Sequence, residues 1–208
     1  MYARCLIAIV TVFAAVTAGA REEDHLAPAD GYLSSYGHSH VYLTAVRDIL
    51  VRSSVDSPAV MVTLPSFQAE SMVYLRPKGD AFEVISARCS EQIWSSEKRD
   101  AIKIQQSERA ISKKAADLIT SVFSIATSRS RYATEPTLGL DGVTYHFSSF
   151  LRGTGVRAGQ TWSPDPASAC GQLVKLGEDL ARYVRGDASE EDLIAEATSL
   201  AHRLKKNA

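Results

Sequence analysis

Two histidines in this chain have the spacing of a metal site. His38 and His40 are two residues apart, so on an extended strand both imidazoles would point to one side and could reach one ion. A third ligand would have to come from Asp24, His25 or Asp30, which only a particular fold would bring close. We therefore expect a solvated histidine pair and assign no metal ligands.

Ser95 and Lys98 match the Ser-x-x-Lys nucleophile motif of serine β-lactamases and penicillin-binding proteins. The Ser-Asp-Asn and Lys-Thr-Gly motifs that accompany it are missing from the sequence, which favours a solvated turn. The glycine-rich segment 153–159 does not have the Gly-x-Gly-x-x-Gly spacing, and strands are predicted on both sides of it, which favours a hairpin turn. No Gly-x-Ser-x-Gly elbow or His-Glu-x-x-His helix occurs. We assign no catalytic residue and no cofactor.

A predicted hairpin near residue 150 offers the best candidate for recognition. Aromatic and arginine side chains dominate the binding energy of protein interfaces. His146, Arg152, Arg157 and Trp162 lie on this hairpin and form the candidate binding surface. In the other interpretation, Trp162 belongs to the core and the arginines are solvated.

Three cysteines bear on the compartment. Cys5 lies within the predicted signal peptide, and its removal leaves Cys89 and Cys170. A pair of cysteines in an exported protein usually forms a disulfide. We therefore expect a structural bridge between Cys89 and Cys170, with two separate buried thiols as the alternative.

Residues 1–20 have the pattern of a cleaved signal peptide. Arg4 precedes an apolar run over 6–16, and Ala18-Gly19-Ala20 supplies the small residues that signal peptidase accepts. The run is too short to span a membrane core of about 30 Å. We expect a periplasmic or secreted protein with no stable membrane insertion after cleavage.

The charge balance limits the partners. The chain has 23 Lys and Arg against 24 Asp and Glu, and the loss of Arg4 leaves 22 against 24, a formal net charge of −2. Nucleic acids and anionic membranes select strongly basic surfaces. We therefore expect no nucleic-acid partner, and another envelope or secreted protein is the favoured one.

The remaining sequence predicts a polar lead-in over 21–37, with a composition that indicates partial disorder, followed by one domain over 38–208. Alternating or short apolar patterns predict strands over 59–64, 71–76, 81–87, 101–105, 143–148 and 156–162. Helical periodicity covers 41–51, 108–128, 173–184 and a last helix that Ser189 caps. Gly186 suits a left-handed helix cap. This pattern predicts an α+β fold, in which an antiparallel sheet of five or six short strands has helices packed on one face and two helices at the C-terminus.

The last third of the chain resembles small exported proteins of Gram-negative bacteria that have no assigned function. In those proteins an Asp-Gly-x-x-Tyr-x-Phe strand precedes a Gly-x-x-Trp-Ser-Pro strand and a terminal helix. The matching residues are Asp141, Gly142, Tyr145, Phe147, Gly159, Trp162, Ser163 and Pro164. The resemblance implies an envelope location and a similar hairpin, and it implies no activity.

These observations favour a non-enzymatic exported binding protein, including an inhibitor or immunity-type partner of another envelope protein. One alternative is a periplasmic hydrolase with a triad that forms only in the folded chain, because triads are defined by geometry and not by chain order. A second alternative is a structural component of an envelope assembly, which an exposed apolar patch on the last helix would favour.

Overall fold

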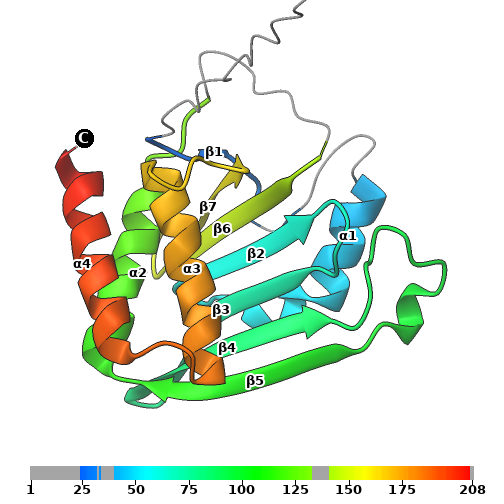
Figure 1. The fold of residues 1–208 in the computed structure, drawn as a ribbon, viewed down its shortest axis with the longest axis horizontal. Helices are drawn as coiled ribbons and strands as arrows, with labels where there is room; N and C mark the ends of the chain where they lie inside the picture. The colour runs from blue at the N-terminus through cyan, green and yellow to red at the C-terminus, as the bar shows by residue number, and fades with distance from the viewer. Residues whose placement is uncertain (1–23, 32, 34–39, 133–140, 207–208) are drawn as a thin grey trace, which may run out of the picture.

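One seven-stranded antiparallel sheet forms the centre of the computed structural model, which describes residues 24–31, 33, 40–132 and 141–206 (Figure 1). The strands follow the order β1-β7-β6-β2-β3-β4-β5 across the sheet. Their bounds are β1 (Ala27–Pro28), β2 (Val60–Pro65), β3 (Ser71–Lys78), β4 (Ala81–Cys89), β5 (Ile104–Ile111), β6 (Val143–Leu151) and β7 (Gly155–Trp162). The predicted signal peptide, residues 1–20, and His38 lie outside the described residues.

Helices cover the two faces of the sheet unequally (Figure 1). The bounds are α1 (His40–Ile49), α2 (Lys113–Ser128), α3 (Ala169–Arg185) and α4 (Glu190–Lys206), with short 3₁₀ turns at η1 (Val51–Ser54) and η2 (Arg99–Ala101). The larger core lies between one face and α2, α3 and α4, and Phe123 and Phe147 meet edge to face within it. The smaller core lies between the other face and α1, and it includes Val46 and Ile85. Among the described helices, none is both long and apolar enough to cross a membrane.

The predicted α+β class is confirmed, including the antiparallel sheet and the two C-terminal helices. The sheet has seven strands where five or six were expected, and α1 lies on the face opposite the other helices. The two strands that form the outer edges, β1 and β5, were the hardest to predict. β1 has only two residues, and β5 carries exposed polar residues along most of its length.

The boundary between β5 and α2 also differs from the prediction. The predicted helix over 108–128 begins only at Lys113, because β5 pairs with β4 from Ile104 through Ile111. The Ser112 side chain then accepts a hydrogen bond from the Ala115 N–H and caps the helix. Tertiary strand pairing therefore outweighs the helical periodicity of these residues.

The C-terminal helices end and begin where the sequence predicts. Gly186 follows α3 with φ 88°, in the left-handed conformation that glycine adopts without steric cost. Ser189 Oγ accepts a hydrogen bond from the Asp192 N–H at 3.1 Å and caps α4. These caps fix the two helices that cover the larger core.

Part of the predicted lead-in, 21–37, is built into the fold. Leu26 is 1% exposed and belongs to the larger core. Ala27 and Pro28 pair with Gln160 and Gly159 on β7. These residues therefore complete one edge of the sheet.

Candidate functional site

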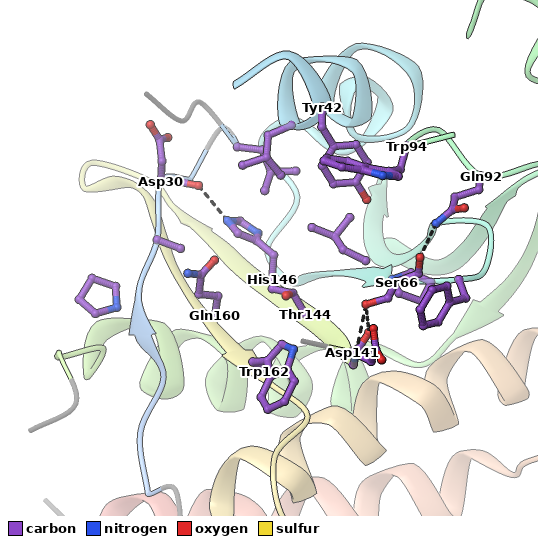
Figure 2. Close-up of a pocket in the computed structure, with 18 residues that line it drawn as sticks. Asp30, Tyr42, Ser66, Gln92, Trp94, Asp141, Thr144, His146, Gln160 and Trp162 are labelled. Carbon is purple, nitrogen blue, oxygen red and sulfur yellow. Dashed lines mark hydrogen bonds between the residues drawn. The ribbon is translucent and has the colours of Figure 1, made fainter. Parts of the chain in front are cut away.

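A pocket of about 800 Å³ opens on the α1 face of the sheet, where β6 begins and β7 ends (Figure 2). Its walls come from β1 and the residues after it, from α1, from the β2–β3 turn and from the segment between β4 and β5. The volume is in the range of small-molecule and side-chain binding sites. We call it the ring pocket, because four aromatic side chains line it: Tyr42, Phe67, Trp94 and Trp162.

Two neighbouring cross-strand pairs form part of the lining. His146 on β6 lies opposite Gln160 on β7, and Thr144 lies opposite Trp162. Residues that lie opposite each other on adjacent strands share one face of a sheet. Polar groups and the Trp162 ring are thus presented side by side toward α1.

Three of the rings, those of Tyr42, Phe67 and Trp94, lie at the mouth of the pocket and along the wall that includes α1. Phe67 is 77% exposed and Trp94 is 60% exposed, which is unusual for large aromatic residues. The Tyr42 and Trp94 rings meet edge to face, with 5.2 Å between centroids and 83° between planes. This arrangement supports the Trp94 ring from behind while it stays accessible to solvent.

The fourth ring, Trp162, is fixed by a close backbone contact. A Cβ atom on Gly142 would lie 2.7 Å from two atoms of the indole, so only glycine fits beneath the ring. Ser163 Oγ accepts a hydrogen bond from the Val143 N–H, and Ser66 Oγ donates one to the Gly142 carbonyl. The glycine, the tryptophan and the serine of the Asp-Gly and Trp-Ser-Pro motifs therefore have a structural role.

His146 is buried in the floor of the pocket. It is 2% exposed, and its Nε2–H donates to the backbone carbonyl of Asp30 at 2.8 Å (Figure 2). Burial lowers the pKa of His146, an effect that the Asp30 carbonyl only partly offsets. Because Nε2 carries the proton, Nδ1 is an acceptor, and among the described residues it has no hydrogen-bond partner.

The geometry around His146 does not form a catalytic triad. Its hydrogen bond reaches the main chain of Asp30, not a carboxylate. The serine that lines the pocket, Ser66, has its hydroxyl hydrogen-bonded to both the N–H and the carbonyl of Gly142. Within the described part of the chain, His146 makes no hydrogen bond to a serine hydroxyl or to a carboxylate.

A buried carboxylate lies behind the α1 wall. Glu70 is 0% exposed, and its oxygens accept hydrogen bonds from the Tyr42 hydroxyl and the Ile93 N–H, both at 2.8 Å. Burial, with Glu70 as a second cause, raises the pKa of the Tyr42 hydroxyl. The same two causes raise the pKa of the Cys89 thiol to about 12. Tyr42 and Cys89 are therefore neutral at physiological pH.

The structure brings together two of the four predicted binding residues. His146 and Trp162 both line the ring pocket. Arg157 lies opposite Ser149 and is exposed on the other face of the sheet, and Arg152 lies in the β6–β7 turn at the far end of the hairpin. Strand alternation separates Arg157 from Trp162, because only an even spacing keeps two residues on one face.

Sequence reasoning missed Tyr42, Phe67, Trp94 and Glu70. Phe67 and Trp94 lie in connecting segments, where periodicity carries no information. A usable signal was present, because Phe67 lies between Ser66 and Gln68, and two serines follow Trp94. Glu70 gave no such signal, since its burial depends on the packing of α1.

The predicted disulfide is wrong. Cys89 lies in the smaller core on β4, whereas Cys170 lies in the larger core at the start of α3. The sheet separates the two thiols, and a disulfide requires Cα atoms within about 7 Å. The alternative of two separate buried thiols is the arrangement found.

The other candidate motifs take ordinary structural positions. Ser95 is exposed and donates to Gln92, and segment 153–159 forms the β6–β7 turn and the start of β7. His40 begins α1, and the described residues contain no cluster of three metal-ligating side chains.

No protein-family model matches the chain, and the comparisons with curated proteins and with solved structures return no match.

Proposed function

We propose that this chain is an exported, non-enzymatic binding protein that holds a segment of another envelope or secreted protein in the ring pocket. One observation carries the proposal: the pocket has accessible aromatic rings around a buried polar floor. Exposed, supported aromatic rings are the usual anchors of protein recognition. The chain would act by binding its partner and blocking it, as an inhibitor or an immunity-type protein does.

Neither alternative function has a supporting observation. A hydrolase needs a nucleophile beside a base, and the Ser66 hydroxyl is engaged with Gly142 instead. An assembly component was expected to expose an apolar patch on α4. The large apolar side chains that are exposed in the described chain lie outside α4, whose Leu193, Leu200 and Leu204 are buried.

The test is capture of the partner by the mature chain, residues 21–208, from its own envelope extract, with quantitative mass spectrometry. Trp94→Ala removes an accessible ring of the pocket. The matched control is Tyr132→Ala, because Tyr132 is 83% exposed and does not line the pocket. Loss of an interface hot spot costs about 2 kcal/mol, which is roughly a 30-fold loss of affinity.

We expect one stoichiometric partner with the wild type and with Tyr132→Ala, and strongly reduced recovery with Trp94→Ala. Recovery of the same partner by all three proteins would place the binding surface elsewhere. Recovery of the chain alone would contradict the proposal.

A further inference from the structure

We propose that the ring pocket takes a cationic group, the side chain of a lysine or arginine in the bound segment. This inference rests on the proposed function, because it names the chemistry of the segment that the pocket would hold. Four features of the pocket support it: the sign of its charges, the buried carboxylate behind its wall, its rings, and the unpartnered acceptor in its floor.

The charges in the lining have one sign. Asp141 and Asp30 line the pocket, although the Asp30 carboxylate points away from the rings (Figure 2), and no lysine or arginine lines it in the part of the chain that the structure describes. His146 adds no positive charge, because burial lowers its pKa. A cleft with charges of one sign and low-dielectric walls concentrates ions of the opposite sign. The charges of the lining therefore favour a cationic ligand over a carboxylate or a phosphate.

Glu70 adds a third carboxylate close behind the lining. Its oxygens accept hydrogen bonds from Tyr42 and the Ile93 N–H, and none of the ion pairs between described residues includes Glu70. A carboxylate buried without a cation is costly. Tyr42 separates Glu70 from the pocket, so a cation against Tyr42 would offset part of this cost.

The rings suit a cation with an apolar stem. Aromatic faces carry negative quadrupole charge and attract ammonium and guanidinium groups. The Tyr42 hydroxyl donates a hydrogen bond to Glu70, which makes the Tyr42 ring richer in electrons. The remaining wall includes Leu33, Leu43 and Leu64, which can contact the methylene groups of lysine or arginine.

The floor of the pocket supplies a hydrogen-bond acceptor. Nδ1 of His146 is a buried acceptor that has no partner among the described residues, and His146 lines the pocket. An unsatisfied buried acceptor favours a ligand that brings N–H donors. Ammonium and guanidinium groups have several such donors and no acceptor. A neutral aliphatic side chain would leave this nitrogen unsatisfied.

The test is a titration followed by NMR of the indole N–H signals. Both tryptophans of the chain, Trp94 and Trp162, line the pocket, so every indole signal reports on it. The probes are the N-acetyl amides of lysine, arginine, norleucine and glutamate. Norleucine is the matched neutral probe, because it keeps the aliphatic stem of lysine without the ammonium group.

We expect saturable shifts of the indole signals with the lysine or arginine probe, and affinity about tenfold weaker for norleucine. The glutamate probe should bind more weakly still, and 0.5 M salt should weaken the cationic probes about threefold or more. Equal affinity for lysine and norleucine, or the absence of any cation-induced indole shift, would overturn the inference.

A charge-removing variant tests the role of Glu70. Glu70→Gln keeps the shape of the side chain: its amide oxygen can accept from the Ile93 N–H, and its NH2 group can donate to the Tyr42 hydroxyl oxygen in place of the bond that Glu70 accepts. The variant should weaken the cationic probes about threefold or more while norleucine binding stays unchanged. The matched control is Glu178→Gln, because Glu178 also accepts from a tyrosine hydroxyl, that of Tyr145, on the opposite side of the sheet. Equal effects of the two variants, or none from Glu70→Gln, would remove Glu70 from the inference.

The two proposals fail separately. If the partner is captured through Trp94 but no cationic probe binds selectively, the cation inference is wrong and the binding function stands. If cationic probes bind selectively but no partner depends on Trp94, the pocket is a cation site and the protein-binding function is wrong.

Discussion

Acid should destabilise this protein through His146. The ring is 2% exposed, burial lowers its pKa, and its one hydrogen bond is donated to the carbonyl of Asp30. The folded state therefore keeps the ring neutral, while the unfolded chain takes up a proton near pH 6.5. Below that pH the unfolded state binds more protons, so the free energy of unfolding falls as pH falls.

The size of the effect follows from the linkage relation. An unfolded-state pKa near 6.5 gives a loss of up to about 1.4 kcal/mol between pH 7.5 and pH 5.5. The full loss occurs while the folded-state pKa stays below that range. For a small domain this is a large fraction of a total stability of roughly 5–15 kcal/mol.

Urea unfolding followed by tryptophan fluorescence at the two pH values measures this loss. His146→Gln removes the titrating group and should unfold with a smaller dependence on pH than the wild type. His202→Gln is the matched control, because His202 is exposed on α4, and this variant should follow the wild type. If the free energy of unfolding of the wild type and of His146→Gln falls by the same amount between the two pH values, His146 is not held neutral in the folded state.

Three further predictions concern packing, thiols and helix capping. Gly142→Ala should lower the free energy of unfolding by about 1–3 kcal/mol in urea titrations, because the new Cβ would lie 2.7 Å from the Trp162 ring; a stability equal to wild type would contradict the close packing. Iodoacetamide should label Cys89 and Cys170 once the protein is denatured, with no reductant needed, and intact mass measures the labelling. Labelling that requires a reductant would show a disulfide. Ser112→Ala should lower the free energy of unfolding by about 1 kcal/mol in thermal melts, because α2 loses its cap, and an unchanged melting temperature would exclude that role.

Much of the fold could be predicted because local chemistry determines it. The helix over 173–184 and its Gly186 cap follow from a stripe of leucines and a residue free to adopt positive φ. The hairpin of β3 and β4 follows from turn residues between apolar runs. The predicted strand over 101–105 overlaps β5 only at its start, because the part of β5 that runs on to Ile111 is held by pairing with β4 and not by a local apolar pattern.

The candidate site, too, could be predicted only where local chemistry determines it. The opposite orientations of His146 and Phe147 follow from strand alternation, and the structure places Phe147 in the larger core and His146 on the α1 face. The pairing of Cys89 with Cys170 was inferred from compartment and count, which carry no information about which face of a sheet each thiol occupies. Glu70 could not be found at all, because its burial requires a helix from elsewhere in the chain.

The short strand β1 determines where this chain can be shortened. Its two residues are the outer neighbours of β7, and the Pro28 nitrogen has no hydrogen to offer another strand. A cut after Asp30 would remove the edge protection of β7, the buried Leu26 side chain and the carbonyl that holds His146. The β7 backbone would then be open to pairing with a second molecule, and the trimmed protein should associate edge to edge. Any shortened form made for crystallisation should therefore begin no later than Asp24.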